Sequence, residues 1–422
     1  MRKPATVALY ALVLLFAAFE VTRSLTRIDG VIFTGYTQVG EVLLQGGDPF
    51  GLTINTWPPF FLFVAAGLAL AARVSLRGAL LVWQVGSVLA IWGCVRLLAR
   101  WFVDDGERLS FWPHAGGDGR PSFASAAVLV PVLLTARLFQ EHLLHTQVNL
   151  LVLFLCLLAF QLFRSRHAAL GGLALAAAAS TKAVPVLLLF YLLYRRRWRE
   201  AAWTVAFLLV LNVVLPVAVF GPAAAGEHWH AWRMVAAEEM ADPTPLYPNQ
   251  SLLAALKRLF TTAGGASDPV HYAIAAWSPR VVTGVFASVV GLAALGMAVA
   301  FGIRPPPPDG RQSAAEWAIC LGAMTIVSPL AGKAHYVTLV APYFLAWSLP
   351  RSRERPGWWR RALLWGSFAC VTLSAPALVG ERMNNALESL NVITVGAVMA
   401  VALALGSLRH DLEPVAGHRR DA

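Results

Sequence analysis

Apolar blocks, each about as long as a membrane span, recur along almost the whole chain. A helix needs roughly 20 mainly apolar residues to cross the hydrocarbon core of a bilayer. Polar and charged residues are concentrated in the connections between these blocks, which leaves no room for a separate soluble domain. The pattern predicts an all-α polytopic membrane protein, with residues 1–422 forming a single membrane-embedded domain.

The blocks predict about 12 transmembrane helices, within a range of about 10 to 13. Residues 5–22 follow Arg2 and Lys3, but no small-residue cleavage site comes after them, so we interpret this block as a retained helix and not as a signal peptide. The other expected spans are 58–72, 78–99, 123–139, 147–163, 168–194, 200–220, 280–302, 314–330, 335–349, 361–379 and 389–407.

Charge and composition set the expected orientation. The chain is 58% hydrophobic and 14% charged, whereas soluble domains are about 45–50% apolar and about 25% charged. Arginines gather in the short connections 195–199, 304–311 and 351–361, which the positive-inside rule places in the cytoplasm. The net charge of +11 is therefore explained by topology in the plasma (cytoplasmic) membrane, and we expect membrane lipids but no nucleic acid as partners.

This orientation defines the remaining segments. Residues 23–57 form the first extracytoplasmic loop, residues 221–280 a large extracytoplasmic loop, and residues 408–422 a short cytoplasmic tail. Strict alternation of the spans puts RSRH at 164–167 outside, against the charge rule, so one element in the first half is expected to be short or broken. Irregular backbone inside a membrane lines a cavity or is buried in protein, and we expect such a cavity near Lys182.

The stretch TRIDGVIFTGYTQVGEVLLQGGDPF, at 26–50, holds the acids of the first external loop. Its apolar residues at positions 32, 36, 39 and 43 form one helical stripe, which predicts a helix lying in the membrane interface. Asp29 precedes this helix and is expected to be its N-cap, a role compatible with that of a half-desolvated base accepting a proton from an attacking hydroxyl. Asp48 in GGDPF is typical of a turn before Pro49, and substrate contact is the alternative.

Lys182, in AAASTKAVPVLLLFY, is the most informative single residue. A charged side chain inside hydrocarbon costs about 2.5–3.5 kcal/mol on insertion scales, so this lysine is expected to face a cavity, an anion or the interface. A phosphate is the natural partner, and snorkelling to the surface is the alternative. Gln147 and Asn149, in HTQVN, begin an apolar helix, where they either cap it or hydrogen-bond a sugar.

Three further groups of polar residues lie in expected external loops. SPLAGKAHYV at 328–337 presents Lys333 and His335, a cation beside a titratable imidazole. Asn249 and Gln250, in NQSL, are interpreted as an N-cap or as substrate contacts. The histidines of EHWH at 227–230 and the four scattered cysteines do not have the spacing of a metal site, and we predict no metal.

Taken in order, these motifs resemble those of the polyprenol-phosphate-mannose-dependent mannosyltransferases of glycosyltransferase family 87, within the GT-C superfamily. Asp29, LLQGGDPF, TWPPF, TQVNLLVLFLCLLAF, GGLALAAAASTKAVPVLLLFYLLYRRRW, NQSLLAAL and SPLAGKAHYVTLVAPY carry the resemblance, over roughly residues 20–350. The sequence departs from the family where His145-Thr146 replaces a glycine that usually precedes Gln-x-Asn, and at Gly332-Lys333-Ala334, where an aromatic and a further polar residue are commoner.

The resemblance implies a GT-C-like bundle that moves a sugar, mannose or in some relatives arabinose, from a polyprenyl phosphate. The acceptor is lipid-linked or a glycan, on the extracytoplasmic face. It implies Asp29 as general base of an inverting displacement, with Lys182, Lys333 or His335 stabilising the departing phosphate. Asp48, Gln147, Asn149, Asn249 and Gln250 are expected on the substrates, and no cofactor is expected beyond the donor. A flippase of a lipid-linked saccharide and a glycan ligase are the alternatives, although the internal repeats common in transporters are not apparent.

Overall fold

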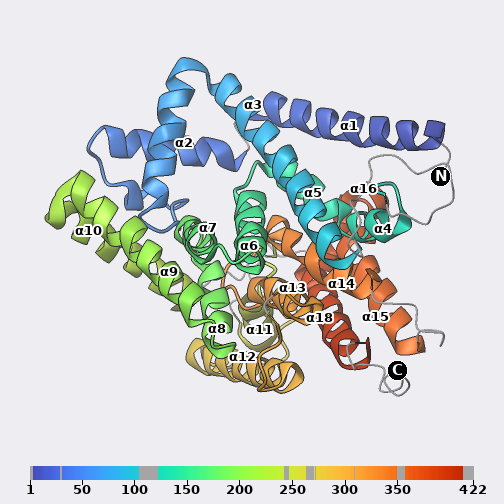
Figure 1. Cartoon of the computed structure of the whole chain (residues 1–422). Helices are drawn as coiled ribbons and strands as arrows, with labels where there is room; N and C mark the ends of the chain where they lie inside the picture. The colour runs from blue at the N-terminus through green and yellow to red at the C-terminus, as the bar shows by residue number, and fades with distance from the viewer. Residues whose placement is uncertain are drawn as a thin grey trace.

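The computed structural model describes residues 3–28, 31–103, 122–241, 247–262, 270, 272–307, 309–348 and 357–411. Within these ranges the regular elements are helices and there is no strand, which confirms the predicted all-α class (Figure 1). The α-helices are α1 (Lys3–Thr26), α2 (Ile32–Leu44), α3 (Phe61–Phe102), α4 (Ala126–Leu134), α5 (Ala136–His145), α6 (Asn149–Arg164), α7 (Ala168–Thr181), α8 (Leu187–Tyr194), α9 (Trp198–Leu209), α10 (Leu215–Ala241), α11 (Leu252–Phe260), α12 (Pro279–Phe301), α13 (Arg311–Ile326), α14 (Val340–Ser348), α15 (Trp358–Phe368), α16 (Pro376–Val379), α17 (Glu381–Ser389) and α18 (Val392–Asp411).

Several of these helices are long and apolar enough to cross a membrane. Among the described residues there are 4 such segments, Thr6–Thr26, Phe61–Phe102, Trp198–Glu238 and Pro279–Phe301. The number rises to 6 if the bent pairs α4–α5 and α17–α18 each count as one span. The chain therefore fits a multi-pass membrane protein, but the expected count of twelve helices is not confirmed. Many of the expected spans are short or broken.

Helix α3 replaces two of the expected spans. The blocks 58–72 and 78–99 lie in one helix, bent at Ser75, whose φ of −162° and ψ of 109° are not helical. The Ser75 hydroxyl accepts a hydrogen bond from the Gly78 amide at 3.0 Å, as an N-cap serine does, so the second arm begins with its own cap. The two arms form a V in Figure 1, and no separate loop divides them.

Helices α7 and α8 form a hairpin where one span, 168–194, was expected. The turn before α7 lies beside the linker after α12, because Arg164 donates to the Asp309 carbonyl at 2.8 Å. The residue after α8 reaches the same linker, since Arg195 donates to the Gly302 and Arg304 carbonyls at 2.7 and 3.1 Å. Both ends of the hairpin thus lie together, and Lys182 lies at its tip, between α7 and the 3₁₀ turn Val184–Val186. Residues 164–167 lie at the same end of the helices as the linker after α12. The hairpin therefore allows RSRH to lie on the side that the charge rule expects for this linker.

The first loop contains the expected amphipathic helix in a slightly shifted position. Helix α2 begins at Ile32, and Val31 occupies the N-cap position without a side-chain cap. The expected N-cap at Asp29 is therefore wrong in position, and Asp29 itself lies outside the described residues. Tyr36 and Val39 of the predicted stripe are buried, and α2 packs on α3. Its location in a membrane interface stays a prediction.

A buried ion pair fixes the base of the hairpin to α13. The Arg195 guanidinium binds both oxygens of Glu316, and its Nε donates to Oε2 at 2.8 Å. Tyr191 and Gln312 also donate to this carboxylate, each at 3.0 Å. Glu316 is fully buried, so its charge is stabilised by these donors and not by water.

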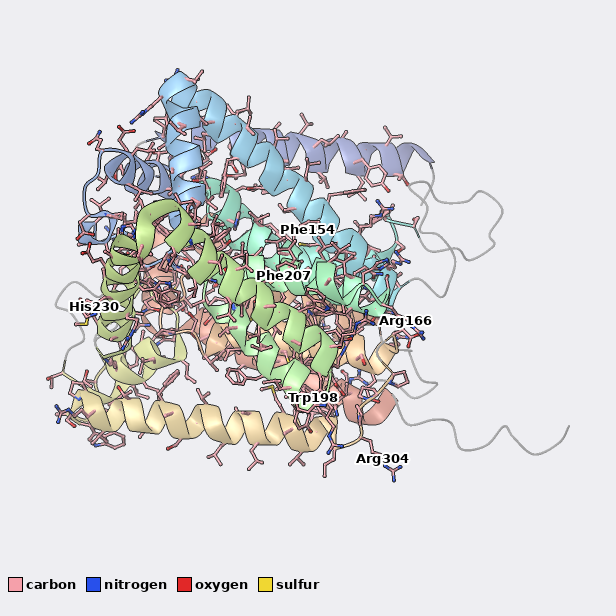
Figure 2. All side chains as sticks on the ribbon, turned by 60° about the vertical axis from the view of Figure 1, so that its left-hand side comes forward. Phe154, Arg166, Trp198, Phe207, His230 and Arg304 are labelled. Carbon is pink, nitrogen blue, oxygen red and sulfur yellow. The ribbon has the colours of Figure 1, made fainter. Side chains whose placement is uncertain are left out.

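The shared side of the two linkers can be tested by cysteine labelling. Figure 2 shows Arg166 and Arg304 at one end of the helices and His230 at the other, and all three are exposed. We expect an impermeant maleimide to label Arg166→Cys and Arg304→Cys from the same side of the membrane, and His230→Cys from the opposite side. Labelling of positions 166 and 304 from opposite sides would contradict the hairpin and indicate that residues 168–194 cross the membrane as a single span.

The ion pair predicts a large difference between two acid-to-amide variants. Glu316→Gln replaces the carboxylate that binds the buried Arg195 with a neutral amide. Breaking a buried ion pair costs about 3–5 kcal/mol. Glu41→Gln is the matched control, because Glu41 pairs with Arg73 at 2.8 Å on an exposed surface. Thermal unfolding in detergent should show a clear fall in Tm for the first variant and little change for the second. Equal Tm values would contradict the assigned role.

Candidate functional site

Lys182 meets Asn149 where the α7–α8 hairpin approaches the start of α6. The Lys182 Nζ donates to Asn149 Oδ1 at 2.7 Å, and the Asn149 amide in turn donates to Gln147 Oε1 at 2.5 Å. Three residues predicted from the sequence are thus brought together. Among the described residues no carboxylate lies within ion-pair distance of Lys182. A cation held only by a neutral amide is a natural partner for an anion from outside the protein.

Two histidines lie within the electrostatic influence of Lys182. His142, on α5, is fully buried, and its Nε2 accepts a hydrogen bond from the Leu150 amide at 2.9 Å. This contact assigns the ring proton to Nδ1. His335 lies in the 3₁₀ segment Lys333–Leu339 that joins α13 to α14. Burial, with the positive charge of Lys182 nearby, holds the pKa of His335 well below its usual value, so this ring is neutral at physiological pH.

Lys333 belongs to a separate charged cluster beside this site. Its Nζ lies 3.0 Å from Glu388 Oε1 and 3.4 Å from Glu141 Oε1. The Glu388 carboxylate is also bound by Arg137 at 2.8 Å, and Glu141 lies 3.3 Å from His145 Nε2. Because Lys333 is already held by two carboxylates, it is less available to a phosphate than Lys182.

Asn249 and Gln250 hold a loop in place and do not point into an open site. The Asn249 Oδ1 accepts from the amides of Ser251 and Ala331 at 3.0 and 3.2 Å. The Gln250 side chain donates to the carbonyls of Tyr247 and Glu388 at 2.6 and 2.7 Å, and is fully buried. Ser251, the next residue, is the N-cap of α11, so the cap lies within NQSL but is neither Asn249 nor Gln250.

Of the two first-loop acids that were predicted as site residues, Asp48 is not part of this cluster and Asp29 lies outside the described residues. Asp48 accepts a hydrogen bond from the Phe50 amide at 2.9 Å and caps the short turn Pro49–Gly51, which confirms its interpretation as a turn residue. Asp29 cannot be placed, because it lies outside the described residues. Phe33, four residues later in the sequence, donates its amide to Thr146 Oγ1 at 3.1 Å. The start of α2 therefore contacts the turn that precedes Gln147.

That turn is strained. Thr146 adopts a left-handed conformation, with φ of 54° and ψ of 39°, which is unusual for a β-branched residue. Besides the bond from Phe33, the Thr146 carbonyl accepts a hydrogen bond from the Trp83 indole at 3.1 Å. Tyr36 accepts from the Val148 amide at the same turn, also at 3.1 Å. These contacts from α2 and α3 fix the conformation that directs Gln147 and Asn149 toward Lys182.

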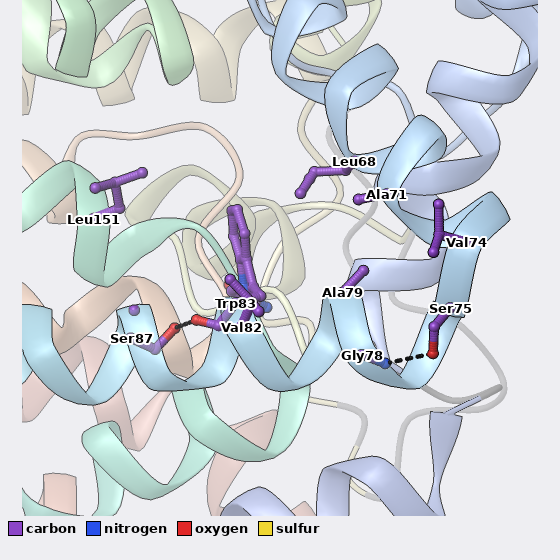
Figure 3. Close-up of a pocket in the computed structure, with 12 residues that line it drawn as sticks. Leu68, Ala71, Val74, Ser75, Gly78, Ala79, Val82, Trp83, Ser87 and Leu151 are labelled. Carbon is purple, nitrogen blue, oxygen red and sulfur yellow. Dashed lines mark hydrogen bonds between the residues drawn. The ribbon is translucent and has the colours of Figure 1, made fainter.

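A cavity of about 650 Å³ lies next to the site, between the two arms of α3 and the start of α6 (Figure 3). Its lining is mostly apolar, and the cavity reaches the site at Gln147 without including Lys182. No group of three metal-ligating side chains occurs among the described residues.

The sequence analysis missed the charged residues of α5 and α17. Arg137 lies near the end of the expected span 123–139, and Glu141 and His142 lie in the short connection before 147–163. Three ionisable residues so close together between two apolar blocks were a usable signal. Glu388 is about 250 residues away in the sequence from this group, and nothing in its local sequence indicated that it would join them.

Comparison with known proteins identifies the family of the chain. The family model for glycosyltransferase family 87 matches residues 55–329, which include Gln147, Asn149, Lys182, Asn249 and Gln250. No curated protein and no solved structure matches the chain. Because the family match covers well over half of the 422 residues, the protein belongs to glycosyltransferase family 87 and is a membrane glycosyltransferase.

Proposed function

We propose that the protein transfers a sugar from a polyprenyl phosphate to a lipid-linked or glycan acceptor on the extracytoplasmic face of the plasma membrane. Mannose is the proposed sugar, with arabinose as the alternative. The observation that carries the proposal is the Lys182–Asn149 contact at 2.7 Å, a cation at the tip of an apolar hairpin whose partner among the described residues is an amide. In the proposal, this cation binds the phosphate of the donor.

The proposed reaction is a single displacement with inversion at the anomeric carbon. A bond forms between the acceptor oxygen and the anomeric carbon, while the bond from that carbon to the phosphate oxygen breaks. The acceptor proton passes to the Asp29 carboxylate, and the polyprenyl phosphate leaves with one additional negative charge. Lys182 supplies a fixed positive charge where this charge develops, which is the kind of stabilisation that lowers a barrier most effectively in a dry site.

His335 has a different proposed role, because its low pKa keeps the ring neutral. A neutral imidazole stabilises a phosphate or sugar oxygen by donating one hydrogen bond, without adding a second buried positive charge beside Lys182. Gln147 and Asn149 are proposed to orient the donor, because Asn149 is hydrogen-bonded to Lys182 and Gln147 is hydrogen-bonded to Asn149. No cofactor or metal is part of the proposal, because a phosphate monoester is a leaving group of low basicity.

The role of Asp29 predicts a loss of transfer in Asp29→Asn. Removing a general base slows a reaction by about 10² to 10⁴-fold, so membranes carrying this variant should form little product from labelled polyprenyl-phosphate mannose. Asp309→Asn, which changes an exposed acid in the linker after α12, is the control and should transfer at the wild-type rate. Equal turnover by Asp29→Asn and the wild type would remove Asp29 from the chemistry.

The role of Lys182 predicts weaker donor binding in Lys182→Met. A charged hydrogen bond contributes about 1.5–3 kcal/mol, so the donor KM should rise at least tenfold, while Lys182→Arg should retain part of the affinity. Arg304→Met, which removes an exposed cation from the opposite end of the hairpin, is the control. Steady-state kinetics over a range of donor concentrations measure this effect. An unchanged KM in Lys182→Met would exclude a phosphate contact.

A further inference from the structure

The cavity beside the site is formed by the bend in α3. The first arm contributes Leu68, Ala71 and Val74, and the second contributes Gly78, Ala79, Val82, Trp83 and Gly86, with Leu151 of α6 opposite (Figure 3). Because Ser75 breaks the helix, the two arms enclose a hollow that a straight helix would lack. Alanine and glycine at four of these positions leave that hollow unfilled.

The outer part of the cavity is accessible and apolar. Val74 is 89% exposed and Val82 is 73% exposed, although both are large apolar residues. In a helix that spans a membrane, such residues face lipid. The cavity is therefore open at exposed apolar residues, which a hydrocarbon chain can contact as it enters.

The inner end of the cavity leads to the candidate phosphate site. Gln147 lines the cavity and accepts the hydrogen bond from Asn149 at 2.5 Å, and Asn149 accepts the bond from Lys182 at 2.7 Å. A path of hydrogen-bonded side chains thus joins the apolar cavity, which ends at Gln147, to a cation that has no carboxylate partner among the described residues. Trp83 forms a fixed wall of this path, because its indole donates to the Thr146 carbonyl.

We propose that the cavity between the arms of α3 binds the isoprenoid chain of the lipid donor next to its phosphate. This inference rests on the proposed function, which places the phosphate at Lys182. A molecule with an anionic head and a single long chain fits both ends of the path at once. A membrane phospholipid of the surrounding bilayer has two chains and a headgroup at the surface, and it does not place its phosphate at Lys182 while filling the cavity.

The position of the chain can be mapped with a polyprenyl phosphate that carries a photoreactive diazirine in its first isoprene units and no sugar. After irradiation of the full-length protein in nanodiscs, we expect the label on peptides that contain residues 68–87 or Leu151. Unlabelled polyprenyl phosphate should compete, and a phospholipid of equal concentration should not. Labels confined to other helices, or equal competition by the phospholipid, would overturn the proposal.

Filling the cavity provides a second test with a matched control. A Cβ added at Gly86 meets no atom within 4 Å, so Gly86→Phe places a ring in the cavity without a backbone clash. Gly291→Phe, on the exposed face of α12, makes the same change where there is also no atom within 4 Å. We expect Gly86→Phe to weaken binding of long-chain polyprenyl phosphate at least tenfold and to leave a short-chain analogue nearly unaffected. Gly291→Phe should bind both like the wild type.

The outcomes separate this proposal from the proposed function. Because the binding probe carries no sugar, specific labelling of the cavity supports the chain site even if the wild type does not transfer a sugar from it. If the wild type transfers the sugar while Gly86→Phe binds the long chain normally, the chain lies elsewhere and the cavity proposal is wrong. Equal weakening of long and short analogues would also contradict it, because the effect would then concern the headgroup.

Discussion

The contact between Lys182 and Asn149 is the interaction on which the candidate site depends. A lysine within an apolar block must either reach water or have a polar partner, since an isolated charge is costly in hydrocarbon. Here the partner is an uncharged amide at 2.7 Å, presented by the first residue of α6. A carboxylate would have neutralised the lysine permanently, whereas the amide satisfies one of its hydrogen bonds and leaves its charge available.

This contact is possible because several chain reversals meet at one place. The α7–α8 hairpin brings Lys182 from one direction, the α5–α6 turn brings Asn149 from another, and the segment after α13 brings His335. The α5–α6 turn needs a residue in the left-handed conformation, which glycine adopts most readily. Thr146 adopts that conformation, and it also supplies the hydroxyl that the Phe33 amide binds. The strain is thus offset by contacts with α2 and α3.

The sequence predicted the helical class and the family, and it indicated Gln147, Asn149 and Lys182 as site residues without predicting that they contact one another. Apolar periodicity identifies helices, and a lysine in an apolar block indicates a polar cavity. The span count was harder to predict, because length and hydropathy do not distinguish a span from a hairpin such as α7–α8 or from a bent helix such as α3. The partners of Lys333 depend on tertiary contacts with α5 and α17, and no local pattern encodes a contact over that separation.

The ion pair between Lys333 and Glu388 links the C-terminal helices to the rest of the candidate site. The family match ends at residue 329, before the C-terminal helices. Yet Glu388 binds both Arg137 and Lys333, and its carbonyl accepts the side chain of Gln250. The C-terminal helices therefore complete the inner wall of the catalytic domain. A shortened version that stops at residue 329 would leave the buried Arg137 without Glu388, so the stable unit of this transferase extends at least through α17.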